Sequence, residues 1–213
     1  MIVEQIKTGG DRNFAYIAAD PSSHLAAVID PSYAPRVVYN RSLELGLQIR
    51  YVLNTHSHHD HTNGNDEMQQ LSGRGALGYK MTDQDSGVQL VDGGDLPLGR
   101  LGVKVIHTPG HTDDSVCFLI GDALFTGDTL FVGKVGGTEF DNEARAEFQS
   151  LRDKLMRLPD DTRVFPGHDV GVKPHSTIGH EKETNPFLLR TDFDSFLELK
   201  KNWLAYKEEH GIA

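Results

Sequence analysis

The sequence predicts a layered α/β protein, and three observations support that fold class. Short apolar runs with strand-like composition alternate with segments whose apolar residues recur at helical spacing. Many of the predicted strands follow one another closely and are separated by Gly, Pro or Asp. The two halves of the chain have a similar order of predicted elements, since in each half strands are followed by a helix. A sandwich of two sheets with helices outside would accommodate this order.

The first half begins with three predicted strands and continues with a helix, a buried strand and a second helix. Asp30-Pro31 ends the third strand, and Gly46 lies where the first helix should end. Asn63 lies near the expected start of the second helix. The strands are expected at 2–6, 14–19, 25–29 and 48–53, and the helices at 34–45 and 63–71.

The second half is richer in strands, with Gly121-Asp122 as a hairpin turn. A helix follows, whose stripe of Phe148, Leu151, Leu155 and Leu158 would face the core. The C-terminal segment is a charged amphipathic helix. The strands are expected at 96–98, 103–107, 115–120, 123–125 and 164–165, and the helices at 142–158 and 193–209.

Length and charge narrow the class of protein. The 213 residues fit one large domain, and 21 basic against 31 acidic residues give a formal net charge of −10. That charge argues against a nucleic-acid partner. With the single cysteine Cys117 no internal disulfide can form, which fits a reducing compartment. We find no secretory signal and no apolar run that could span a membrane, so we expect a cytoplasmic protein.

The histidines carry the strongest chemical signal. Of the 11 histidines, four lie between His56 and His61, directly after the predicted strand 48–53. His56 and His58 are two residues apart, so in an extended segment both imidazoles point the same way and could bind one metal ion. Asp60 and His61 follow where the chain turns toward the helix and would face a neighbouring position. Imidazole nitrogen and carboxylate oxygen are usual ligands for zinc or iron.

Three later turns could complete such a site. His111, Asp128 and His168 each follow a glycine directly after a predicted strand. Glycine lets the backbone turn sharply at these positions. Each turn is a weak signal alone, but the three together with the histidine cluster predict a metal-dependent enzyme.

Other chemically notable residues receive structural interpretations. His59 points away from its neighbours by strand alternation, and His107 ends a strand. Cys117 is a packed small apolar residue within a strand rather than a nucleophile. His175 and His180 are either residues at the mouth of the site or exposed loop residues. Trp203 and Tyr206 anchor the C-terminal helix.

These motifs, in this order and spacing, resemble the metallo-β-lactamase superfamily, and within it the branch of glyoxalase II (hydroxyacylglutathione hydrolase) and the persulfide dioxygenases. The resemblance covers residues 1 to about 190. It implies a four-layer αβ/βα sandwich of two mixed sheets with metal at one sheet edge. We expect residues 1–190 to form the catalytic domain and residues 191–213 to pack on it. The matching segments are 55–61, 109–112, 125–131, 166–168 and 176–187.

The resemblance also implies the ligands and the reaction. One metal would be held by His56, His58 and His111, the other by Asp60, His61 and His168, with Asp128 bridging them. Asp60 and Asp128 would then be catalytic. One or two Zn²⁺ ions would activate water to cleave a small thioester, with Fe²⁺ as the other candidate metal. The expected partner is a small-molecule substrate, and a homodimer is left open.

A second reading is a mononuclear iron persulfide dioxygenase, with iron on His56, His111 and Asp128. The chain departs from that pattern, because Gly137 replaces the arginine that helps to bind glutathione and Val170 replaces a tyrosine. A third reading, a non-catalytic metal-binding protein, fits poorly, since a structural site rarely needs seven ligands.

Overall fold

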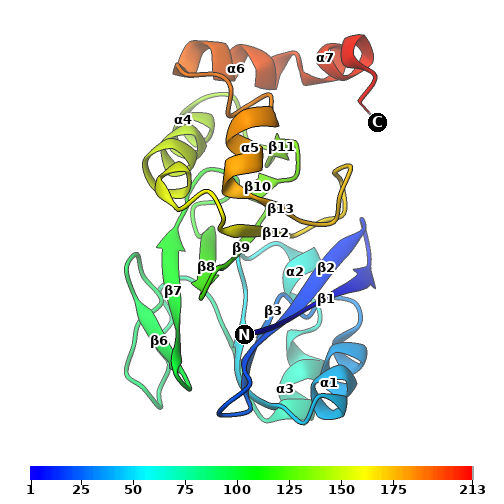
Figure 1. Cartoon of the computed structure of the whole chain (residues 1–213), viewed down its shortest axis with the longest axis vertical. Helices are drawn as coiled ribbons and strands as arrows, with labels where there is room; N and C mark the ends of the chain where they lie inside the picture. The colour runs from blue at the N-terminus through cyan, green and yellow to red at the C-terminus, as the bar shows by residue number, and fades with distance from the viewer. Residues whose placement is uncertain (213) are drawn as a thin grey trace.

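The computed structural model describes residues 1–212, and its first sheet is formed by the first five strands of the chain (Figure 1). The strand order is β1-β2-β3-β4-β5. The first three strands are antiparallel, whereas β3, β4 and β5 run parallel. The strands are β1 (Ile2–Gly9), β2 (Asn13–Asp20), β3 (Leu25–Ile29), β4 (Gln48–Leu53) and β5 (Ala76–Leu77).

The second sheet contains six strands in the order β13-β12-β9-β8-β7-β6. It is also mixed, because β9 and β12 are parallel while its other neighbours are antiparallel. A separate hairpin pairs β10 with β11. The strands are β6 (Asp95–Leu98), β7 (Leu101–His107), β8 (Val116–Ile120), β9 (Ala123–Gly127), β10 (Leu130–Phe131), β11 (Lys134–Val135), β12 (Arg163–Pro166) and β13 (Ser176–Thr177).

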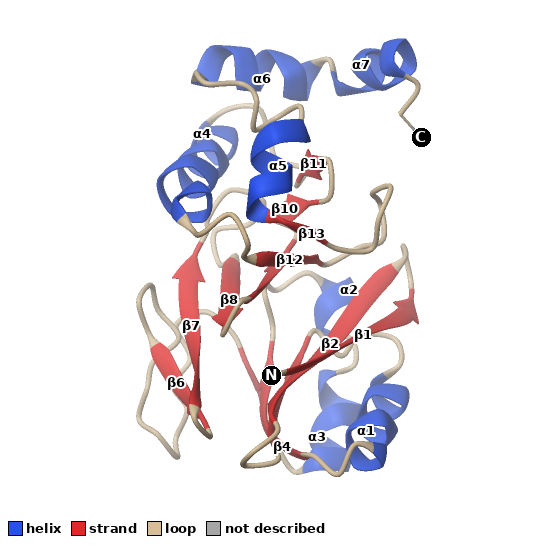
Figure 2. Ribbon diagram, in the orientation of Figure 1, coloured by secondary structure: helices blue, strands red, loops and turns tan. Residues whose placement is uncertain are grey.

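The helices lie outside the two sheets, as Figure 2 shows. In that view α1 and α3 lie below the first sheet, and α4 to α7 gather at the opposite end of the molecule. The helices are α1 (Pro35–Glu44), α2 (His59–Thr62), α3 (Asn65–Ser72), α4 (Asn142–Gln149), α5 (Ile178–Thr184), α6 (Phe193–Lys201) and α7 (Trp203–His210).

Three apolar clusters hold these layers together. Between the sheets, the ring of Tyr16 lies 5.1 Å from Phe125 and 5.6 Å from Phe165. Val38 and Met68 bring α1 and α3 against the outer face of the first sheet. A third cluster packs α5 and α6 on the outer face of the second sheet. Helix, sheet, sheet and helix therefore form the four-layer sandwich that the family resemblance implies.

The expected helix 63–71 is wrong at its start. Asn63 ends α2, and Gly64 precedes the first turn of α3. The Asn63 side chain does not cap a helix, because its Oδ1 accepts a hydrogen bond from the backbone N–H of Tyr33 at 2.8 Å. The asparagine therefore ties the loop after β3 to the segment that carries the histidines.

The expected helix 142–158 is also not regular. The α-helix ends at Gln149, and a wide π-helical turn (Ser150–Lys154) and a tight 3₁₀ turn (Leu155–Arg157) follow. The hydroxyl of Ser150 donates to the carbonyl oxygen of Pro109 at 2.8 Å. Leu151 and Leu155 still face the core as predicted.

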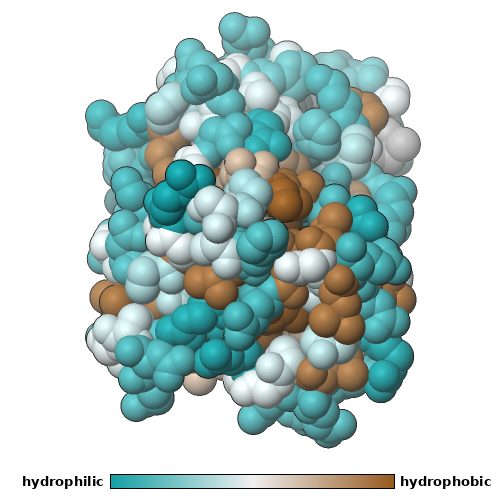
Figure 3. Space-filling model, turned by 60° about the horizontal axis from the view of Figure 1, so that its bottom comes forward, coloured by the Kyte–Doolittle hydropathy of each residue, from teal (hydrophilic) through white to brown (hydrophobic). Residues whose placement is uncertain are grey.

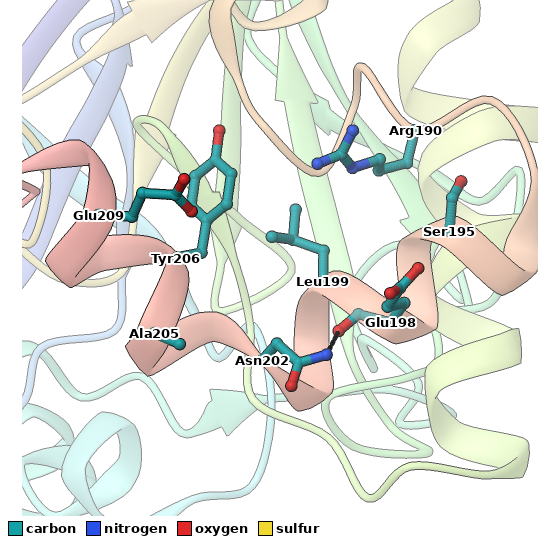
Figure 4. A pocket seen from close by; sticks show the side chains of 8 residues that line it. All are labelled: Arg190, Ser195, Glu198, Leu199, Asn202, Ala205, Tyr206 and Glu209. Atoms are coloured by element: carbon teal, nitrogen blue, oxygen red, sulfur yellow. Dashed lines mark hydrogen bonds between the residues drawn. The ribbon is translucent and has the colours of Figure 1, made fainter.

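The C-terminal segment forms two helices instead of one. Asn202 separates α6 from α7, and its Nδ2 donates to the carbonyl oxygen of Glu198 at 3.0 Å (Figure 4). This break turns Trp203 onto Phe187, with ring centroids 4.8 Å apart, and Tyr206 stacks on Trp203. Both aromatic residues therefore anchor the segment as expected.

The surface of the protein is largely polar on the face in Figure 3, where hydrophobic residues gather in separate patches. Within residues 1–212, none of the helices combines the length and apolar character needed to cross a membrane.

The packing of α6 gives a test of whether the C-terminal segment unfolds together with the sandwich. Phe196 is buried and contacts the rings of Phe148 and Phe187. We expect Phe196→Ala to lower the free energy of unfolding by about 3–5 kcal/mol in a single denaturant transition. Leu204→Ala, at a residue 74% exposed, should change it by less than about 0.5 kcal/mol. Two separate transitions would show that the segment unfolds on its own.

Candidate metal centre

The predicted donor residues meet where strands of both sheets end. β4, β7, β9 and β12 lead into the segments that carry the histidine cluster, His111, Asp128 and His168, respectively. Two backbone hydrogen bonds join the sheets at this edge. The N–H of Val116 donates to the carbonyl of Thr55, and that of Phe14 donates to the carbonyl of Gly167, both at 2.8 Å. Residues far apart in the sequence are thereby held in one place.

Three imidazoles form the first group of donors. Nδ1 of His58 lies 3.0 Å from Nε2 of His56 and 3.0 Å from Nε2 of His111. His56 and His58 point the same way, as their spacing predicts. The donor atoms of all three residues lie within 4.8 Å of one another, a separation that one metal ion could bridge.

A carboxylate and two imidazoles form the second group. Nε2 of His61 lies 3.2 Å from Nε2 of His168. Oδ2 of Asp60 lies 3.4 Å from Nε2 of His168 and 3.7 Å from Nε2 of His61. Asp60 and His61 lie on α2, the turn of helix that follows the extended segment. The change from strand to helix therefore directs these side chains to a second position.

Asp128 lies between the two groups. Its Oδ1 is 3.3 Å from Nε2 of His61, and its Oδ2 is 3.6 Å from Nε2 of His111 and 3.4 Å from Nε2 of His168. The residue before it, Gly127, has φ of +49°, which favours glycine. A Cβ there would also lie 2.4 Å from Oγ1 of Thr55. This sharp turn places the carboxylate against both groups.

In three histidines the ring nitrogen that faces away from the cluster, Nδ1, has a hydrogen-bond partner in the surrounding protein. Nδ1 of His168 faces the carbonyl of Asp11 at 2.7 Å, and Nδ1 of His111 faces the carbonyl of Gly137 at 2.7 Å. Nδ1 of His61 lies 2.9 Å from Oδ2 of Asp30. These acceptors place the proton on Nδ1 and leave Nε2 free to bind a cation.

Asp30 is the main residue of the site that the sequence analysis missed. Besides His61, its buried carboxylate accepts hydrogen bonds from the backbone N–H and the hydroxyl of Thr55, at 2.8 and 2.7 Å. In the sequence it reads only as the end of a strand. A signal was present, because β3 and β4 are parallel neighbours and Asp30 leaves the same sheet edge as the cluster. Asn13, which donates to Oδ2 of Asp60 at 3.1 Å, was missed too.

The electrostatics of the cluster favour a bound cation. Burial lowers the pKa of His56 to about 4, so this imidazole is neutral near pH 7. Burial alone would lower the pKa of His61, but the carboxylates of Asp30 and Asp128 outweigh it and raise the pKa to about 10. Oδ1 of Asp128 is buried and makes no hydrogen bond within residues 1–212. A divalent cation would supply the positive charge and the partner that these carboxylates need, so the residues fit a metal ion.

The residues interpreted as structural lie outside the cluster. His59 is exposed at the start of α2, and His107 stacks on Tyr79 with centroids 4.0 Å apart. Burial raises the pKa of the Cys117 thiol to about 11, which agrees with a packed, unreactive side chain. His175 is exposed, whereas His180 lines a cavity.

That cavity has a volume of about 670 Å³, and several of its lining residues follow ligands of the cluster closely in the sequence. Its lining includes Val132 to Lys134, a few residues after Asp128, and Val170 and Gly171, just after His168. Trp203 and Lys207 of α7 also line it. Three basic side chains, those of Arg12, Lys134 and Lys207, contribute to its walls. Burial lowers the pKa of Lys134, so anionic groups nearby would be needed to offset the cost of its charge.

Comparison with known proteins assigns the family. The sequence pattern of the metallo-beta-lactamase superfamily matches residues 8–168, so the chain belongs to this superfamily and is one of its enzymes. It is 37% identical to the hydroxyacylglutathione hydrolase of Polaromonas sp. (strain JS666 / ATCC BAA-500), over 79% of this chain and 67% of the relative. It is 33% identical to the human mitochondrial persulfide dioxygenase ETHE1, over 82% and 71%, respectively.

The crystal structure of ETHE1 from Myxococcus xanthus is similar to this protein, with a TM-score of 0.85 and 32% identity, covering 95% of this chain and 91% of that one. Relatives named for two different activities are therefore similar to this chain. The superfamily and the cluster together indicate binding of divalent metal.

The support given by Asp30 can be tested by Asp30→Asn. An amide cannot accept hydrogen bonds from Thr55 and His61 with both of its polar atoms, so His61 should lose its orientation. We expect metal affinity to fall by about 10–100-fold, measured by competition with a chromophoric chelator. Asp85→Asn, which alters the ion pairs of Asp85 with Arg50 and Arg74 away from the cluster, is the control. Equal affinity in the two variants would contradict this role for Asp30.

Proposed function

We propose that this protein is a two-metal hydrolase that cleaves a small thioester. The observation that carries the proposal is the position of Asp128, whose two carboxylate oxygens face different histidines between two groups of three donors. An arrangement with one shared carboxylate suits two cations better than one. A hydrolase agrees with the name of the Polaromonas relative, a hydroxyacylglutathione hydrolase.

In this proposal His56, His58 and His111 hold one cation, Asp60, His61 and His168 hold the other, and Asp128 contacts both. Zinc is the proposed metal, and iron is the alternative. When bound, such a pair lowers the pKa of a shared water and stabilises the developing oxyanion. Asn13 orients the Asp60 carboxylate through its Nδ2, so this ligand is in place before any substrate binds.

The alternative activity, persulfide oxidation at a single iron, has the support of the ETHE1 relatives. Two residues favour the hydrolase instead. Gly137 offers no side chain where the dioxygenase pattern has an arginine, and its carbonyl is occupied by His111. Val170, which lines the cavity, offers no hydroxyl where that pattern has a tyrosine.

The cavity lined by residues that follow Asp128 and His168 in the chain indicates the chemistry of the carrier. Arg12, Lys134 and Lys207 surround it, and the acid among its lining residues, Glu181, already accepts from the N–H of Gly133 and from Asn185 through Oε2. We infer that the thiol carrier of the substrate bears an anionic group that binds there. A small-molecule substrate and a cytoplasmic location remain predictions from the sequence.

Metal analysis combined with Asp60→Ala tests the two-metal mechanism. We expect about two metal ions per chain, cleavage of simple thioesters and no oxygen uptake with a persulfide. Asp60→Ala should lower the rate of thioester cleavage by more than about 100-fold, because a ligand of one cation is lost. Asp66→Ala, at an exposed position on α3, should leave the rate unchanged. One iron per chain with oxygen uptake would instead establish the dioxygenase.

The proposed anionic carrier is tested by Lys134→Met, which keeps an unbranched apolar side chain but removes the ammonium, whose Nζ lies 5.2 Å from the centroid of the Phe131 ring. We expect KM to rise about tenfold, equivalent to about 1.4 kcal/mol, for a thioester with a carboxylate or phosphate on its thiol part. KM for a neutral thioester should not change. Lys201→Met, at an exposed position on α6, is the matched control. The same KM effect on both substrates would rule out charge recognition by Lys134.

A further inference from the structure

A buried ion pair links two of the outer helices close to the metal centre. Glu147 of α4 is fully buried, and Lys200 of α6 is nearly so. The ammonium of Lys200 donates to Oε2 of Glu147. Burying two charges has a large desolvation cost that their attraction barely offsets, so such a pair is weak evidence for stability alone. Its other contacts indicate a more specific role.

Lys200 makes a second contact, with the loop that holds His111. Its Nζ donates to the carbonyl oxygen of Gly136 at 2.7 Å. The carbonyl of the next residue, Gly137, accepts from Nδ1 of His111 at 2.7 Å. Lys200 therefore fixes the peptide adjoining the one that orients this imidazole.

Glu147 lies against Gly110, the residue that precedes His111. A Cβ on Gly110 would lie 2.4 Å from Cβ and 2.5 Å from Cα of Glu147, so the backbone of α4 presses directly against the turn. One helical turn later, the hydroxyl of Ser150 holds the carbonyl of Pro109. The contacts form a closed circuit around the imidazole. His111 is held by Gly137, the neighbouring Gly136 is held by Lys200, Lys200 pairs with Glu147, and Glu147 lies against Gly110, the residue before His111.

We propose that Lys200 and Glu147 are positioning residues for His111. They fix the loop carbonyl on one side of the imidazole and the backbone turn on the other, so that Nε2 faces His58 and Asp128. The C-terminal helix α6 is thereby part of the support of the metal centre. This inference rests on metal binding by the cluster and is independent of the reaction that the metal serves.

The test measures metal binding by the full chain and needs no substrate. Lys200→Met keeps the apolar stem and removes both hydrogen bonds. We expect the affinity for Zn²⁺ to fall by about 10–100-fold in chelator competition, as for other residues that orient metal ligands. We also expect the visible absorption spectrum of the Co²⁺-substituted protein to change, because this spectrum reports the arrangement of ligands around the metal.

The control is Arg152→Met. Arg152 also ties two segments together, since its guanidinium donates to the carbonyls of Leu188 and Arg190 in the segment between α5 and α6, but it does not contact the residues that surround His111. This variant should lose stability while keeping the Zn²⁺ affinity and the Co²⁺ spectrum of the parent. Equal affinity and equal spectra in Lys200→Met and Arg152→Met would overturn the proposal.

A double variant separates positioning from stability. Lys200→Met leaves the Glu147 carboxylate buried without its partner, so the single variant can unfold. Adding Glu147→Gln removes that charge and should restore the melting temperature. The carbonyl of Gly136 still lacks its donor, so Zn²⁺ affinity should stay low. Recovery of affinity together with stability would show that the pair acts only through folding.

Discussion

The arrangement of the site depends on supplying positive charge to carboxylates that are largely removed from water. Asp30 and Asp128 lie in the interior at the edge of the sandwich, and His61 lies between them. Removing a carboxylate from water is costly unless a cation or several donors replace the water. A proton on His61 meets part of this need, and bound metal would meet it fully. The convergence of loops from both sheets is the structural means of bringing donors to these carboxylates.

Support for the imidazoles comes largely from backbone carbonyls. His111 and His168 are each held by the carbonyl of a loop residue, Gly137 and Asp11. A carbonyl is fixed only as firmly as its loop, so the surrounding fold has to hold each loop in turn. The lengths of the loops and the packing of α4 and α6 therefore affect ligand geometry, although no side chain of α6 reaches a ligand directly.

The sequence is sufficient to predict which polar side chains lie together, because these residues have a recognisable spacing after strands. His56, His58 and the three residues that follow glycines all lie in the cluster. The sequence does not predict the role of a polar residue that has two common structural uses. Asp30 resembles a strand terminator and Asn63 resembles a helix cap, yet each is used in a contact with a distant segment. The break at Asn202 was missed because neither Gly nor Pro marks it.

The recess lined by Arg12, Lys134 and Lys207 belongs to a molecule whose formal net charge is −10. An anion approaching from bulk water therefore meets repulsion at long range and attraction only near the opening. Dissolved ions screen distant charges more than close, half-buried ones. Moderate ionic strength should accordingly speed the encounter, until screening also weakens the basic walls. The rate of association would thus pass through a maximum as the salt concentration rises. For partners of opposite net charge this rate falls steadily instead.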